Sequence, residues 1–115
     1  MKTATVVLIT RENLVLLGRK QGDPEIGVGT LNGPGGKMES TDKNTLDCVI
    51  RETQEEFEIV FDPTKLKKVV IITFHVGDEP WQEVHFYRTS AFSGEPQETE
   101  SMVPEWPRSA QPFFY

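Results

Sequence analysis

The chain has 115 residues, of which 37% are hydrophobic and 26% charged, and its formal net charge at pH 7 is −6. This length suits one domain with a single core, and we expect residues 1–115 to form it. The acidic balance argues against binding to a nucleic-acid polymer, which depends on cationic neutralisation of phosphates. No apolar run approaches the roughly 18 residues of a membrane span, and no signal-peptide cleavage region follows the first residues. A cytoplasmic protein without a membrane partner is therefore expected.

The first 30 residues predict a hairpin followed by a loop. A β-branched, apolar run covers residues 3–10, and a second apolar run covers residues 14–17 after three polar residues. We expect two paired strands, the first of them buried on both faces. Arg19 and Lys20 follow at once, and the glycines and proline of residues 21–30 predict a loop.

A glycine-rich segment comes next, at residues 33–36. Gly35 and Gly36 can bring backbone groups close to a phosphate or a metal. Asn32, which lies directly before a glycine, is by itself a common turn former.

A helix is predicted over Thr45–Phe57, because an apolar stripe recurs there at helical spacing. The stripe consists of Leu46, Val49, Ile50, Thr53 and Phe57. Glu52, Glu55 and Glu56 are then expected to share the other side. Like charges at this spacing repel, but a divalent cation reverses that cost, and Mg²⁺ prefers carboxylate ligands. The alternative interpretation is an ordinary solvated helix face.

The remaining chain predicts a second hairpin and an irregular end. Residues 69–74 are expected to form a buried strand, residues 77–80 a turn, and residues 81–89 the partner strand. Prolines at 104, 107 and 112 exclude a long terminal helix. The single cysteine, Cys48, excludes an internal disulfide, and on the helix it is expected to pack rather than to react.

Residues 36–59 resemble the Nudix box, G-x5-E-x7-R-E-U-x-E-E-x-G-U, where U is aliphatic. Residues of this chain match the opening glycine, the R-E and E-E pairs and the closing U at their mutual spacing: Gly36, Arg51, Glu52, Glu55, Glu56 and Ile59. Counted from Gly36, the second motif position is Asp42, and Arg51 then comes one residue late. Counted back from Arg51, that position is Lys43. Thr53 replaces the middle U. Glu58 replaces the late glycine, where a left-handed cap costs roughly 1 kcal/mol.

The resemblance implies a fold and an activity. The fold is the Nudix α/β/α sandwich with a mixed sheet, here without a full C-terminal helix. The activity is hydrolysis of a phosphoanhydride bond with Mg²⁺, or Mn²⁺, as the cofactor. Residues 31–37, LNGPGGK, are similar to the lead-in of the MutT-like branch, which acts on 8-oxo-dGTP. A nucleotide is thus the expected partner, and the protein is expected to be a monomer or a homodimer that covers an exposed sheet face.

The resemblance also implies roles for individual residues. Expected metal ligands are Gly36, Glu52, Glu55, Glu56 and Glu83. Expected catalytic residues are Glu52, Glu55 and Arg51, the last of which orients Glu55; the general base is Glu52, Glu55 or another glutamate. Expected substrate contacts are Asn32, Arg19, Lys20, Gly35, Lys37 and Trp106. Trp106 has two open interpretations, stacking on a base or filling the core. The base is otherwise read by Glu105 or by the cluster Phe113, Phe114 and Tyr115.

The sequence therefore predicts an enzyme that cleaves purine or oxidised purine nucleoside triphosphates to a monophosphate and pyrophosphate. Two alternatives stay open. A catalytically impaired Nudix module would bind a nucleotide or a protein partner, which the altered loop and terminus suggest. A hydrolase of dinucleoside polyphosphates or nucleotide sugars would keep the chemistry and change the substrate.

Overall fold

The computed structural model describes residues 1–21 and 31–107, so the predicted loop at 22–30 and the aromatic cluster at 113–115 lie outside the described residues. The elements, in chain order, are β1 (Lys2–Arg11), β2 (Leu14–Val15), β3 (Leu17–Lys20), β4 (Leu31–Asn32), β5 (Gly35–Lys37), α1 (Thr45–Phe57), β6 (Val60–Phe61), a 3₁₀ turn (Pro63–Lys65), β7 (Lys67–Val76), β8 (Glu79–Thr89), β9 (Phe92–Ser93) and β10 (Met102–Glu105).

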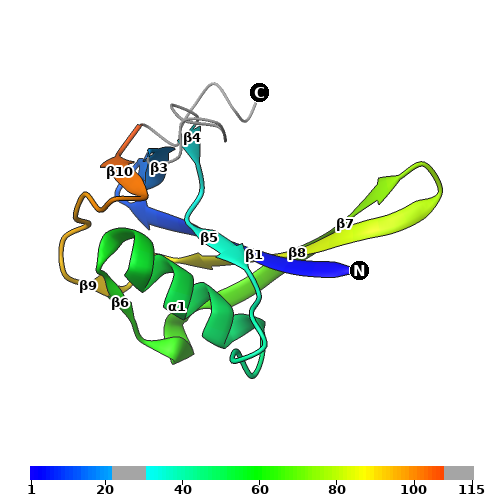
Figure 1. Ribbon diagram of the computed structural model, residues 1–115. Coiled ribbons are helices and arrows are strands. Elements are labelled where there is room, and N and C mark those ends of the chain that lie inside the picture. Colours follow the sequence, from blue (N-terminus) through cyan, green and yellow to red (C-terminus); the bar gives the residue numbers. More distant parts are fainter. Residues whose placement is uncertain (22–30, 108–115) are drawn as a thin grey trace.

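The main sheet has the order β2-β1-β8-β7, with β5 paired to β1 as well. Strands β1 and β8 are parallel and the other pairs are antiparallel, so the sheet is mixed, as predicted. Helix α1 lies against one face of this sheet (Figure 1). A small sheet, β10-β3-β4, and a two-stranded ribbon, β6-β9, complete the described chain.

The first hairpin is confirmed, with a correction to its burial. Thr10 pairs with Val15 across a two-residue turn, but β2 ends there, and the chain passes through the buried Leu16 into β3 of the small sheet. On β1, Val7 and Ile9 are fully buried beneath α1, whereas Leu8 on the opposite face is 38% exposed. The prediction of burial on both faces holds only in part: on the face away from α1, Ala4 is buried, but Val6 is half-buried and Leu8 exposed, because α1 covers only the other face.

Helix α1 begins and ends where its sequence pattern predicted. At the start, the side chain of Asn44 accepts a hydrogen bond from the backbone N–H of Asp47 (2.8 Å), which satisfies one of the free amides of the first turn. At the end, Glu58 is left-handed with φ of 60° and donates its N–H to the carbonyl of Gln54 (2.8 Å). The cap that the Nudix box gives to glycine is therefore formed here by a glutamate.

Replacing Glu58 by glycine is expected to raise the free energy of unfolding by about 1 kcal/mol, because glycine adopts positive φ without a steric penalty. In a domain of this size that change raises the melting temperature by roughly 4 °C. Thermal denaturation followed by circular dichroism measures the shift. Gln54→Gly, on the exposed side of the same helix, is the control and should lower the melting temperature; an unchanged or lower value for Glu58→Gly would contradict the capping argument.

The predicted strand pairing of the second hairpin is confirmed, but the predicted burial of its first strand is wrong. Strands β7 and β8 form it, and the turn is shorter than predicted, at Gly77 and Asp78. All ten residues of β7, including the predicted buried stretch 69–74, are exposed. The reason is topological: β7 is the last strand of the sheet, and the hairpin extends away from the body of the molecule (Figure 1).

The C-terminal part of the described chain adds a strand rather than a helix. Strand β10 pairs with β3, from Met102 opposite Lys20 to Glu105 opposite Leu17.

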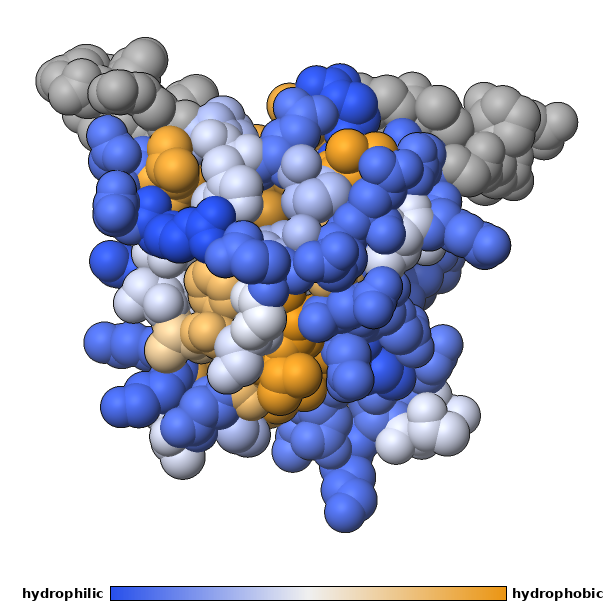
Figure 2. All heavy atoms as spheres, turned by 90° about the vertical axis from the view of Figure 1, so that its left-hand side faces the viewer, coloured by the Kyte–Doolittle hydropathy of each residue, from blue (hydrophilic) through white to orange (hydrophobic). Residues whose placement is uncertain are grey.

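The side of the molecule that carries α1, β6 and β9 is mostly polar, with apolar side chains reaching the surface near its middle (Figure 2). Within residues 1–21 and 31–107, no helix is both long and apolar enough to cross a membrane.

Candidate active site

A groove of about 540 Å³ lies between the main sheet and the small sheet. Its apolar part comes from β1 and β8, on the side of the sheet opposite α1, through Ala4, Val6 and Val84. Its polar part comes from Lys20, Asn32, Gly35, Gly36, Lys37, Glu56, Gln82 and Ser101. The groove thus has an apolar floor of sheet, and its lining also contains two lysines and the buried carboxylate of Glu56.

Glu56 is the most buried of the three helix glutamates, with 8% of its surface exposed. Its Oε1 accepts a hydrogen bond from the backbone N–H of Gly35 (2.9 Å). Burial is the main reason that the pKa of Glu56 is raised to about 7; the charges of Glu52 and Glu55 add to the rise, and the Gly35 N–H opposes it. Glu52 and Glu56 share a side of the helix, as expected, and both approach β5, Glu52 at Gly36 and Glu56 at Gly35. For Glu56 this is not an outer side, because it comes about two helical turns after the buried Val49 and is buried itself.

Glu52 lies directly against the second glycine of β5. A Cβ atom at Gly36 would be 2.5 Å from the Glu52 carboxyl carbon and 2.6 Å from its Oε2. The close approach of this carboxylate to the backbone therefore requires glycine at position 36. Burial raises the pKa of Glu52, and the neighbouring Arg51 opposes that rise.

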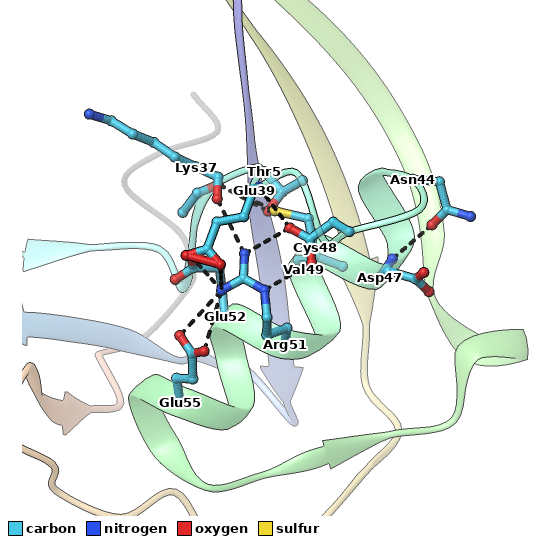
Figure 3. A network of polar contacts seen from close by, with 12 residues as sticks. Thr5, Lys37, Glu39, Asn44, Asp47, Cys48, Val49, Arg51, Glu52 and Glu55 are labelled. Carbon is cyan, nitrogen blue, oxygen red and sulfur yellow. Dashed lines mark hydrogen bonds and ion pairs between the residues drawn. The ribbon is translucent and has the colours of Figure 1, made fainter.

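Arg51 ties the loop to the helix (Figure 3). Its Nε and Nη2 donate to the two carboxylate oxygens of Asp42, at 2.9 and 2.8 Å. Its Nη1 lies 3.1 Å from Glu52 and 3.3 Å from Glu55, so the predicted i,i+4 pair is present. The guanidinium holds the pKa of Asp42 down to about 2, helped by the backbone N–H of Glu39. Asp42 rather than Lys43 therefore contacts the motif arginine.

The predicted substrate residues separate into two groups. Lys20, Asn32, Gly35 and Lys37 line the groove. Arg19 instead forms an ion pair with Glu105 on β10, with Nε 2.5 Å from Oε2. This contact raises the pKa of Arg19 and lowers that of Glu105. Both carboxylate oxygens of Glu105, a candidate for reading the base, accept hydrogen bonds from Arg19.

Trp106 lies against the core. Its ring stacks on Phe92, with centroids 6.2 Å apart, and the guanidinium of Arg11 lies 4.2 Å from its ring centre. The position corresponds to the second of the two interpretations of Trp106, and the groove has no lining from this residue. Cys48 is buried in contact with Thr5, and burial raises the pKa of its thiol, as a packing residue requires.

Sequence reasoning missed the apolar floor of the groove and several other lining residues, among them Gln21, Gln82, Ser101 and Met102. Gln82 has a detectable signal, because it alternates with Glu83 on a strand whose other face packs on the helix. Ser101 and Met102 come to the groove only through the pairing of β10 with β3, some 80 residues earlier in the chain, which no local pattern predicts.

The protein-family model for the NUDIX domain matches residues 1–111 of this chain. The chain belongs to the Nudix family. Over 106 residues it is 35% identical to the oxidized purine nucleoside triphosphate hydrolase of Danio rerio, a match that covers 91% of this chain and 65% of the relative. The protein of the same name from Mus musculus is 36% identical over 103 residues, which cover 89% of this chain and 63% of the relative. The Nudix chain thus spans less than two thirds of the length of these curated relatives.

The fold of a solved Nudix structure is similar as well. The crystal structure of a MutT NUDIX hydrolase from Burkholderia pseudomallei superposes with a TM-score of 0.73 at 24% identity, over 91% of this chain and 81% of that one. The predicted Nudix fold is therefore confirmed. In the described residues, however, α1 is the single α-helix, so the sandwich has one helical layer.

Nudix hydrolases use divalent metal ions, and the donor set of this chain suits such an ion. Glu52 and Glu56 both have raised pKa values because burial and like charges disfavour their ionised forms, and a divalent cation would relieve both effects. Within the described ranges, no three acidic, imidazole or thiol side chains surround a common point, and the Arg51 guanidinium lies among the carboxylates (Figure 3). Glu55, whose side chain is 59% exposed and paired with Arg51, would have to rotate toward Glu52 and Glu56 to bind the same ion.

Glu83, the predicted ligand from outside the Nudix box, lies on β8 on the side of the sheet that faces α1. Its Oε1 is 2.5 Å from Nε2 of the buried His85. The other ring nitrogen of His85, Nδ1, is buried and has no hydrogen-bond partner among the described residues. His85 packs in the strand, as expected, and the metal-binding role of Glu83 stays a prediction.

Proposed function

We propose that this Nudix protein is a Mg²⁺-dependent pyrophosphohydrolase that converts purine and oxidised purine nucleoside triphosphates to a monophosphate and pyrophosphate. The observation that carries the proposal is the groove, which joins an apolar floor, an asparagine amide and two lysines to the buried end of a glutamate-rich helix. Such a groove suits a flat base, its polar edge and a phosphate chain in that order. The names of the curated relatives support the same substrate class.

The charges of the site explain how the chain would act on a phosphate chain. Phosphate oxygens repel an attacking hydroxide, so cationic groups must offset their charge. Lys20 and Lys37 supply two such groups at the groove. A Mg²⁺ ion held by Glu52, Glu55, Glu56 and the carbonyl of Gly36 would supply further positive charge and acidify a water.

The protein residues then position the carboxylates and accept a proton. Arg51, fixed by two hydrogen bonds to Asp42, holds Glu52 and Glu55 at 3.1 and 3.3 Å. We place proton acceptance on a carboxylate oxygen of Glu52, because its pKa is raised and it lies against Gly36, a lining residue of the groove.

A phosphate-release assay tests the activity and the role of Asn32. Purified protein with Mg²⁺ or Mn²⁺ should hydrolyse dGTP and 8-oxo-dGTP, with pyrophosphate detected after addition of a pyrophosphatase. Asn32→Ala should raise KM for purine triphosphates about three- to tenfold, the effect of one lost hydrogen bond, while Asn13→Ala in the first hairpin turn should leave KM unchanged. If neither ion supports turnover of any nucleotide in a panel that includes dinucleoside polyphosphates and nucleotide sugars, the enzyme proposal fails.

A second candidate is a Nudix module that binds a nucleotide without cleaving it. The observation in its favour is the position of Arg51, whose Nη1 lies between 3.1 and 3.5 Å from Glu39, Glu52 and Glu55. Calorimetric titration with a non-hydrolysable nucleoside triphosphate analogue separates the two candidates. Binding without turnover of the corresponding natural nucleotide would favour the module.

A further inference from the structure

We infer that the free edge of β7 is a pairing surface for a second copy of this chain, joined as an antiparallel strand pair about a two-fold axis. Strand β7 ends the order β2-β1-β8-β7, and no other strand of the described chain pairs with its outer edge. Exposed backbone donors and acceptors along a ten-residue edge form a template for another strand, and natural proteins protect such edges.

The side chains of β7 point to the same kind of partner. Val70, Ile72 and Phe74 lie opposite Phe86, Val84 and Gln82 of β8, on the side of the sheet away from α1. Ile71 lies opposite His85, on the side that faces α1.

These apolar residues of β7 are between 40 and 48% exposed. Apolar surface on both sides of one strand is not covered by a helix laid on one face of the sheet. An added strand, with its own side chains alternating to both faces, covers both sides and pairs the edge.

The charges at the two ends of β7 select a second copy and fix its direction. Lysines precede and begin the strand at positions 65, 67 and 68, and acidic residues follow it at positions 78 and 79. An antiparallel pair of identical strands brings the basic end of each copy to the acidic end of the other. A parallel pair would set lysine against lysine, which is unfavourable across strands. The edge is therefore complementary to itself, as an isologous interface requires.

The irregularities of β7 suggest the register. Its pairing with β8 shifts between Lys68 and Val70 and again between Phe74 and His75, so Val70–Phe74 is the regular stretch. The middle of this stretch is Ile72. An axis at Ile72 sets Val70 of one copy against Phe74 of the other, and it places Lys67 and Lys68 of one copy beside the β7–β8 turn of the other, next to Asp78 and Glu79.

Sedimentation velocity over a range of protein concentrations tests the pairing on the chain as it stands. The wild type should show a monomer–dimer equilibrium, and Ile72→Lys should raise the dimer dissociation constant about tenfold or more by setting two lysines together on the axis. Val60→Lys replaces a similarly exposed apolar residue of β6, outside this edge, and should leave the equilibrium unchanged. Circular dichroism shows that each variant is folded.

Charge exchange makes the test specific. A Lys65→Glu, Lys67→Glu double variant has two acidic strand ends, an Asp78→Lys, Glu79→Lys double variant has two basic ends, and each alone should dimerise less than wild type. Their equimolar mixture should regain dimer as a heterodimer. Any of three results would overturn the inference. The wild type could stay monomeric at all concentrations, or Val60→Lys rather than Ile72→Lys could weaken the dimer. The mixture could also associate no better than its two components.

Discussion

Replacing Glu56 by glutamine is expected to abolish turnover and, at the same time, to make the metal-free fold more stable above pH 7. The first effect follows because glutamine lacks the charge that a metal ligand in the proposed site needs. The second follows because the carboxylate of Glu56 is buried with its ionised form disfavoured. Glutamine keeps an oxygen for the Gly35 N–H and carries no charge at any pH.

The pH dependence has a definite sign. The pKa of Glu56 is raised from 4.5 to about 7 in the folded protein, so between these pH values the folded state binds more protons than the unfolded state. Stability from this group is present below about pH 4.5 and is lost as the pH rises through 7. At pH 8 the ionised group costs on the order of 3 kcal/mol, and Glu56→Gln removes that cost.

Melting temperatures of wild type and Glu56→Gln between pH 5 and 8 measure the effect. The two should be close at the acidic end of that range and diverge as the pH rises, with the variant the more stable. Glu100→Gln, at an exposed position outside the site, is the matched control and should follow wild type throughout. Added Mg²⁺ should stabilise wild type at pH 8 and not the variant. Parallel curves for wild type and Glu56→Gln would contradict the burial argument.

The parts of the fold that the sequence predicts well are those whose causes are local. Helix α1 follows from the spacing of Val49, Thr53 and Phe57 and from the capping residue Asn44, all within one segment. The first hairpin follows from two apolar runs and the polar turn between them. The contact between Arg51 and Glu55 follows from the helical repeat alone.

The parts that sequence reasoning missed depend on what each segment packs against. The run of residues 69–74 has the composition of a buried strand, yet β7 is exposed because no helix of the described chain covers it and it lies at the sheet edge. For Glu56 the error has the opposite direction: a charged residue on a helix is usually solvated, but this one is buried. The glycines of β5 allow α1 to approach so closely that this carboxylate is enclosed.

The residues of the groove also divide into those that local sequence predicts and those that depend on packing. Lys20, Asn32 and Lys37 lie next to recognisable motif residues, so the sequence placed them near the site. Arg19, one residue from Lys20, points to the other side of β3 because neighbouring strand residues alternate. The alternation is predictable, but which side faces the groove depends on the pairing of β3 with β10.

Gly35→Ala is expected to reduce mainly the stability of the fold, and Gly36→Ala mainly the activity. At Gly35 the backbone has φ of 139°, and a Cβ atom would lie 2.1 Å from the carbonyl oxygen of Thr5. Because that neighbour is backbone of the central strand β1, Gly35→Ala should cost about 3 kcal/mol or more of stability. At Gly36 the Cβ atom would instead meet the carboxylate of Glu52 at 2.5 to 2.9 Å, which is the flexible end of a side chain and can move.

Gly36→Ala should therefore keep a melting temperature close to wild type while its kcat falls by about 100-fold, because Glu52 is displaced by about 1 Å from its position in the site. Gly35→Ala should lose most of its folded population at moderate temperature, and this loss should account for most of its fall in activity. Thermal melts and initial rates with dGTP, scaled to the folded fraction, measure both. Full activity of Gly36→Ala would show that Glu52 does not act from its observed position, and equal destabilisation by both alanines would show that Gly36 serves the fold rather than the site.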